Sequence, residues 1–134
     1  MINATRTALP PIKIRQADME RLAHLAEAAA ETSPATAEFL AGEIERATVV
    51  PDMAPLAGVV GMESEVVFRD DATGVQKQVT LVYPKAANIE AGRISVLTPI
   101  GAALIGLSAG QAISFATPSG ETRSLTVLEV RGPN

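Results

Sequence analysis

The chain has 134 residues and a formal net charge of −4, with 47% hydrophobic and 19% charged residues. This composition suits one compact domain with an appendage, and it excludes wholesale disorder. The acidic balance argues against coating of DNA or RNA by phosphate neutralisation. An aromatic content of 3% argues against recognition by base stacking.

The sequence contains no cysteine and one histidine, His24. Disulfides and thiolate metal sites are therefore excluded, and we expect no metal and no cofactor. No apolar run approaches the roughly 20 residues that cross a bilayer, and residues 1–15 hold no segment typical of a signal peptide. We expect a soluble, cytoplasmic protein that does not bind membranes.

The first predicted element is an extended lead-in or very short strand at Ile12 and Ile14, which alternate with charged residues. An amphipathic helix follows, with Gln16 or Asp18 as its cap. Its apolar face consists of Met19, Leu22, Ala23, Ala26, Ala29 and Ala30.

A second helix is predicted after the break at residues 32–34, with Ser33 as its cap and Pro34 at its first position. Its apolar face consists of Ala37, Leu40, Ala41, Ile44 and Ala47. Two amphipathic helices joined by a few residues indicate an antiparallel hairpin. Each helix has about 14 residues, so the hairpin is about 20 Å long.

A linker begins at Pro51 and marks the predicted boundary between two domains, a helical hairpin at residues 1–50 and a globular domain at residues 51–134. In the second domain, residues 62–69 and 75–83 are predicted to form a β-hairpin.

The stretch from Ile94 to Leu107 predicts a strand followed by a short helix. Thr98 offers a side-chain oxygen to the helix start, and Pro99 suits the first helical position. Ile100, Ala103, Leu104 and Leu107 form the apolar face of that helix. Strands at residues 111–116 and 123–130 follow, joined by the turn 117–120, so the residues themselves indicate an α+β fold.

Residues 95–106 (Ser-Val-Leu-Thr-Pro-Ile-Gly-Ala-Ala-Leu-Ile-Gly) resemble the S-V-x-[ST/A]-P-[IV]-G-x-A-L-[IL]-G signature of the C-terminal domain of Gre transcript-cleavage factors. Within that superfamily, residues 81–84 (Leu-Val-Tyr-Pro) and the short N-terminal region resemble the Rnk family, regulators of nucleoside diphosphate kinase. The resemblance covers residues 18–130. It implies a short coiled-coil hairpin followed by an FKBP-like antiparallel sheet with one short packed helix.

The resemblance also implies a partner, RNA polymerase, bound near the mouth of its secondary channel. The corresponding loop carries docking in Gre-like domains, so the docking candidates here are Leu97, Thr98, Pro99 and Ile100. An equally weighted interpretation is that these residues are a capped helix start that packs into the core. DNA binding is attributed to the superfamily as a whole, but we expect no direct sequence-specific contact with nucleic acid, and we expect a monomer.

The tip of the hairpin differs from that of Gre factors, which resemble this chain and carry paired acids that hold Mg²⁺ in the polymerase active centre. Hard cations need several oxygen ligands. The candidates here are Glu31, with Glu27 one turn earlier and Glu38 one turn later on the other helix. The hairpin is also about half as long as cleavage would require. We therefore expect no catalytic residues and a non-enzymatic regulator.

Other motifs have plain structural interpretations. Asp70 and Asp71 indicate a solvated turn, and His24 a surface or packing residue. Gly101 and Gly106 lie in or after a helix rather than in a phosphate loop.

Two alternative functions remain open. The first is a peptidyl-prolyl isomerase, as an FKBP-like fold suggests, but that activity needs an apolar pocket lined with aromatic side chains and the chain has four aromatic residues. The second is indirect control of the level of nucleoside diphosphate kinase.

Overall fold

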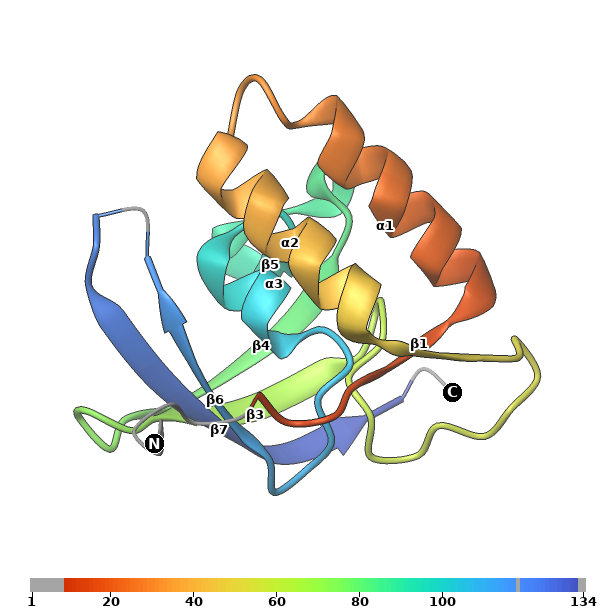
Figure 1. The fold of residues 1–134 in the computed structure, drawn as a ribbon. Coiled ribbons are helices and arrows are strands. Elements are labelled where there is room, and N and C mark those ends of the chain that lie inside the picture. Colours follow the sequence, from red (N-terminus) through yellow and green to blue (C-terminus); the bar gives the residue numbers. More distant parts are fainter. Residues whose placement is uncertain (1–8, 118, 133–134) are drawn as a thin grey trace, which may run out of the picture.

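The computed structural model describes residues 9–117 and 119–132 of the chain. Its main element is a five-stranded sheet with the strand order β5-β4-β3-β7-β6. The helices gather on one side of this sheet, so the fold is α+β, as predicted (Figure 1). The strands are β3 (Glu65–Asp70), β4 (Gln76–Val82), β5 (Arg93–Ser95), β6 (Ala112–Ala116) and β7 (Thr122–Arg131).

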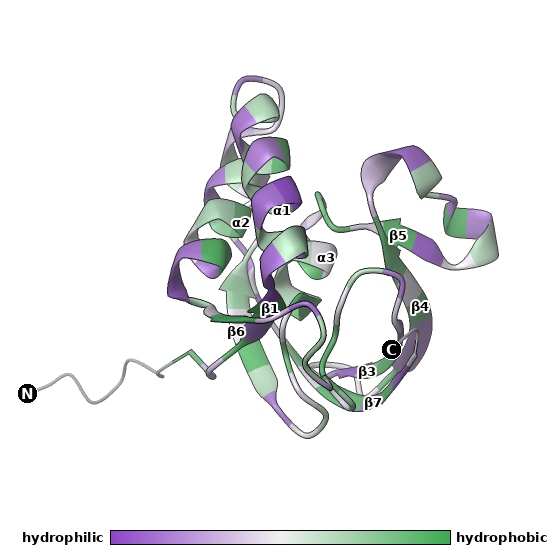
Figure 2. Cartoon of the chain, turned by 90° about the vertical axis from the view of Figure 1, so that its right-hand side faces the viewer, coloured by the Kyte–Doolittle hydropathy of each residue, from purple (hydrophilic) through white to green (hydrophobic). Residues whose placement is uncertain are grey.

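The pairs β3–β4, β3–β7 and β6–β7 are antiparallel, as expected. The edge strand β5 instead joins β4 in parallel. The connection between them holds two 3-10 turns, η1 (Pro84–Ala86) and η2 (Ile89–Ala91), and it stands out from the sheet (Figure 2). A connection that crosses back in this way brings the next strand in with the same direction, whereas a tight turn would reverse it.

The N-terminal hairpin is present as predicted and consists of α1 (Gln16–Ala28) and α2 (Pro34–Arg46). Two short parallel strands, β1 (Lys13–Arg15) and β2 (Thr48–Val50), join the two ends of the hairpin. The hairpin lies over the short helix α3 (Pro99–Leu104), which packs against α2 (Figure 1). It therefore packs against the rest of the molecule and does not project from it.

The start of α1 differs from its prediction, because neither Gln16 nor Asp18 caps the helix. Arg15 occupies the cap position and makes no capping bond with its side chain. Instead, the Asp52 carboxylate in the distant 51–58 segment accepts a hydrogen bond from the Ala17 N–H at 2.9 Å. A free N–H of the first turn is thus satisfied from a segment that is remote in sequence.

The second helix also departs from its prediction. Ser33 holds the cap position, but its side chain makes no capping bond. Ala41 is exposed, whereas Glu43 is buried with 2% exposure. The Arg46 guanidinium donates to both Glu43 carboxylate oxygens at 2.7 and 2.8 Å, and also to the Pro10 carbonyl. Burial of a charged group requires such a partner, so this pair fastens α2 to the chain that precedes β1.

One hydrophobic core runs through both parts of the molecule. Leu22 and Leu40 of the hairpin are completely buried, as is Leu104 of α3, whose burial was predicted. They belong to one cluster together with residues of the sheet. Figure 2 shows the hairpin alternating between hydrophilic and hydrophobic residues, as expected for helices with one buried face.

Candidate functional site

The strand-to-helix corner, residues 97–100, connects β5 to α3. The Thr98 hydroxyl oxygen accepts a hydrogen bond from the Gly101 N–H at 3.0 Å and donates to the Ser95 carbonyl at 2.7 Å. The Ser95 hydroxyl oxygen accepts from the Leu97 N–H at 2.9 Å. The predicted Thr98 cap is therefore confirmed, and three bonds within seven residues hold the corner in one conformation.

Gly101 makes this corner possible. A Cβ atom at Gly101 would lie 2.1 Å from the Ser95 carbonyl oxygen and 2.9 Å from the Val96 Cα. No side chain fits there unless the strand and the helix separate. The glycine is thus required by the close approach of the first turn of α3 to the end of β5.

All four docking candidates, Leu97, Thr98, Pro99 and Ile100, are half-buried. Leu97 and Ile100 also pack against the core. This agrees with the interpretation of the corner as a capped helix start that packs into the core, and part of each side chain also reaches the surface, while docking stays a prediction. A rigid surface that is partly apolar is suited to bind another protein.

The three hairpin candidates, Glu27, Glu31 and Glu38, are all exposed. Glu27 and Glu38 line the same groove, which lies between α1 and α2 and is described below, whereas Glu31 does not line it. Within residues 9–117 and 119–132, no group of three or more histidine, aspartate or glutamate side chains could hold a metal ion.

Two contacts that the sequence does not reveal fasten α1 to the domain. The Tyr83 hydroxyl donates to the Asp18 carboxylate at 3.3 Å, and the Arg21 guanidinium lies 4.2 Å from the centre of the Tyr83 ring. Burial raises the pKa of Asp18. Burial, followed by the negative charge of Asp18, raises the pKa of Tyr83 to about 12. Arg21 is therefore directed towards the domain and away from the outer face of the hairpin.

His24 is exposed, as one of its two interpretations predicted. Asp70 and Asp71 were predicted to form a solvated turn, and the structure adds an ion pair to each of them. Asp70 pairs with Arg123 at 3.1 Å, and Asp71 pairs with Arg69 at 2.9 Å. The Ala72 N–H, followed by Arg123, lowers the pKa of Asp70. These bonds stabilise the β3–β4 turn, so both aspartates have a structural role there.

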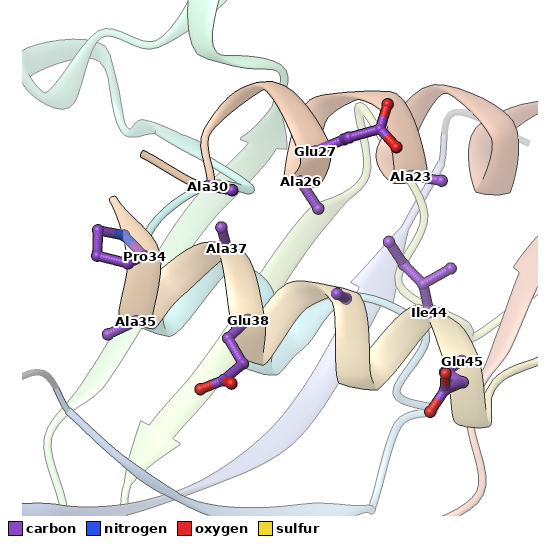
Figure 3. A pocket seen from close by; sticks show the side chains of 11 residues that line it. Ala23, Ala26, Glu27, Ala30, Pro34, Ala35, Ala37, Glu38, Ile44 and Glu45 are labelled. Atoms are coloured by element: carbon purple, nitrogen blue, oxygen red, sulfur yellow. The ribbon is translucent and has the colours of Figure 1, made fainter. Parts of the chain in front are cut away.

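The outer face of the hairpin bears an open groove of ≈ 920 Å³ between α1 and α2, named here the alanine groove. Figure 3 shows Ala26 and Ala37 directed into the space between the two helices. The groove is lined by Ala23, Ala26, Glu27, Ala30, Pro34, Ala35, Ala37, Glu38, Ala41, Ile44 and Glu45. Helical periodicity identified most of these alanines as one apolar face, but it did not reveal which of them stay open to solvent.

Comparison with known families gives two matches that cover most of the chain. Residues 55–132 match the family described as transcription elongation factor GreA/GreB, C-terminal. Residues 10–50 match the family described as Rnk N-terminus. In the described part of the chain, no helix is long and apolar enough to cross a membrane.

Individual relatives agree with these families. The regulator of nucleoside diphosphate kinase of Escherichia coli K12 is 36% identical over 121 residues, which cover 90% of this chain and 89% of that protein. The transcription elongation factor GreA of Syntrophobacter fumaroxidans is 44% identical over 68 residues, 51% of this chain and 43% of that protein.

A solved structure described as a prokaryotic transcription elongation factor GreA/GreB from Nitrosomonas europaea is similar over 92% of this chain and 99% of its own. The TM-score is 0.71 and the identity 36%. The helical hairpin, the corner and the sheet therefore define a protein of the Gre-like transcription factor class. Within that class, the chain belongs to the Rnk family, the regulators of nucleoside diphosphate kinase.

Proposed function

We propose that this protein is a transcription regulator that binds RNA polymerase near the mouth of the secondary channel, through the strand-to-helix corner, without promoting transcript cleavage. The observation that carries the proposal is the corner itself. It lies in the segment that matches the GreA/GreB C-terminal family, and the Thr98 and Ser95 hydrogen bonds hold it rigid. A preorganised surface loses little conformational entropy on binding.

The hairpin supports the second half of the proposal. Glu27 and Glu38 stand on different helices, and no third acid joins them to make a metal site within the described residues. The helices have 13 residues each, about 20 Å of length. Leu40, which is fully buried in the shared core, and the Phe39–Phe115 stack hold α2 against the domain. A short hairpin that is packed along its own domain is poorly suited to deliver a cation into a distant active centre.

The aromatic side chains offer little support for an isomerase. Phe39 and Phe115 stack on each other, Phe68 is buried, and Arg21 covers Tyr83. An isomerase pocket needs an open apolar surface that can receive a proline ring.

Control of nucleoside diphosphate kinase through transcription is compatible with the proposal, because a regulator can change the amount of an enzyme without binding it.

Binding to purified core RNA polymerase tests the docking surface. The variant Pro99→Ala/Ile100→Asp is expected to weaken binding by about tenfold or more, because it removes the ring and places a charge in the apolar part of the contact. A matched control is Ile89→Asp, which introduces the same charge at a side chain that is 85% exposed on η2. The control is expected to bind like the wild type.

Ile100 also packs against the core, so folding of the double variant has to be checked by circular dichroism. The single variant Pro99→Glu serves as a second test, because an acidic residue is tolerated in the first turn of a helix. If folded variants of the corner bind polymerase as tightly as the wild type, the corner is not the docking surface.

A further inference from the structure

The alanine groove is an open hollow of ≈ 920 Å³ lined mainly by small side chains. Six alanines line it, five of them in the two helices and the sixth, Ala30, just after α1; its other apolar members are Pro34 and Ile44. Because most of the apolar side chains in the groove are alanine methyl groups, another helix can approach α1 and α2 closely, since interaxial distances depend on the side chains at the contact. The two helices that border the groove have 13 residues each and are therefore about 20 Å long.

The rim of the groove carries charge of one sign. Glu27, Glu38 and Glu45 belong to the lining itself, and Glu20 borders an adjoining hollow beside His24. All four glutamates are exposed. Their carboxylates stand on both sides of the apolar floor, so a ligand in the groove meets negative charge along both edges.

The arginines of the hairpin do not neutralise this rim. Arg21 lies over the Tyr83 ring on the domain side of α1. Arg46 is bound to the buried Glu43 carboxylate and to the Pro10 carbonyl. Both arginines of the hairpin thus have partners away from the groove, Arg21 on the domain and Arg46 on Glu43 and Pro10, and the acids of the outer face stay available to a partner.

We propose that the alanine groove binds an amphipathic helix of a partner protein, with the apolar stripe of that helix on the alanine floor and its lysines or arginines along both rims. This is the helix-in-groove mode of recognition. The negative charge of the rim favours a basic helix over a second copy of the chain. Two copies joined by their grooves would place the glutamates of one rim against those of the other, whereas a basic helix pairs with them.

The groove and the strand-to-helix corner are built from different elements, so this proposal does not depend on polymerase docking. The probe is a labelled synthetic peptide of about 14 residues that forms a helix with a leucine stripe flanked by lysines. A second peptide keeps the leucine stripe and replaces each lysine with glutamate. Fluorescence anisotropy against the full chain measures both affinities.

Two groove variants and one matched control sharpen the test. Ala23→Gln/Ala41→Gln fills the floor at two exposed positions with good helix formers. Glu27→Gln/Glu38→Gln/Glu45→Gln removes the rim charges. The control, Glu63→Gln/Glu65→Gln/Glu121→Gln, removes three exposed charges outside the groove, so it changes the net charge equally.

We expect saturable binding of the lysine peptide, weakened about tenfold by each groove variant and unchanged in the control, with no binding of the glutamate peptide. Equal weakening in the control would show non-specific attraction to an acidic protein and would overturn the proposal. So would the absence of saturable binding, or a concentration-dependent dimer that the groove variants abolish, because the groove would then belong to a second copy.

Discussion

Phe39 of α2 stacks on Phe115 of β6, with ring centroids 5.9 Å apart and ring planes inclined by 11°. This contact joins the Rnk-like N-terminal hairpin to an edge strand of the GreA/GreB-like domain. Together with the Tyr83–Asp18 hydrogen bond, it fastens the hairpin to the domain on two sides. The hairpin and the sheet therefore share one core and are expected to unfold together.

The stacked pair leads to the first prediction. A double-mutant cycle with Phe39→Ala and Phe115→Ala should give a coupling energy of about 0.5–1.5 kcal/mol, the usual contribution of an aromatic pair beyond its buried area. Urea unfolding of the four proteins measures it. Strictly additive losses would mean that the rings do not contact each other in solution.

The second prediction concerns the core beneath the hairpin. Leu104 of α3 is fully buried among residues from both parts of the chain. Leu104→Ala should lower the free energy of unfolding by about 2–5 kcal/mol, through lost burial and the cavity that remains. A loss far below 1 kcal/mol in denaturant melts would show that this site is not packed as described.

The third prediction uses two glycines as a matched pair. Gly101→Ala should destabilise the protein by about 1–3 kcal/mol, because the new methyl group meets the Ser95 carbonyl. Gly42→Ala, in the middle of α2, has no atom within 4 Å of the new Cβ. That substitution should stabilise the helix by about 0.5–1 kcal/mol. Thermal melts give the sign of each change in stability, and a Gly101→Ala variant as stable as the wild type would contradict the close approach of α3 to Ser95.

The fourth prediction concerns the only tyrosine of the chain, Tyr83. Its phenol should ionise with a midpoint near pH 12, against an ordinary value of 10.0, mainly because it is buried. Asp18→Asn should lower the midpoint, since it removes a negative charge that opposes ionisation. Arg21→Gln should raise it, since it removes a nearby positive charge. Ultraviolet absorbance of the tyrosinate gives the three curves.

The same pKa shift has a consequence for stability. Below pH 10 the Tyr83 phenol is protonated in both the folded and the unfolded protein, so its contribution to stability is intact. Between about pH 10 and pH 12 the unfolded chain loses the proton first, and stability falls as the pH rises. Circular dichroism followed in parallel shows whether the protein is still folded at each midpoint. A wild-type midpoint near 10 in the folded protein would contradict the burial of the Tyr83 phenol beside Asp18.

Local rules predicted the corner well because its determinants are adjacent in the sequence. Thr98 and Pro99 are a cap and a first helical residue whose roles do not depend on distant partners. The burial of Leu104 followed from helical spacing in the same way. The resemblance of residues 95–106 to a known signature then gave the class of the domain.

Other features depend on residues that are far apart in the chain. The cap of α1 comes from Asp52, and the Arg46 guanidinium that pairs with the buried Glu43 carboxylate also donates to the distant Pro10 carbonyl. Periodicity assigns such a glutamate to the surface. The parallel placement of β5 depends on the path of residues 83–92, which no local pattern specifies. The domain boundary near residue 51 stays a prediction, although the two family matches end and begin on either side of it.

The most direct test of the central claim is a transcript-cleavage assay on stalled, backtracked elongation complexes with Mg²⁺ and an excess of this protein. We predict that release of the 3′ RNA fragment does not exceed the polymerase's own rate. We also predict that the protein slows release when a Gre factor is present, because both would compete for the mouth of the channel. Fragment release faster than the polymerase's own rate would contradict the non-enzymatic account, and unchanged Gre-stimulated release at saturating protein would contradict docking at the channel.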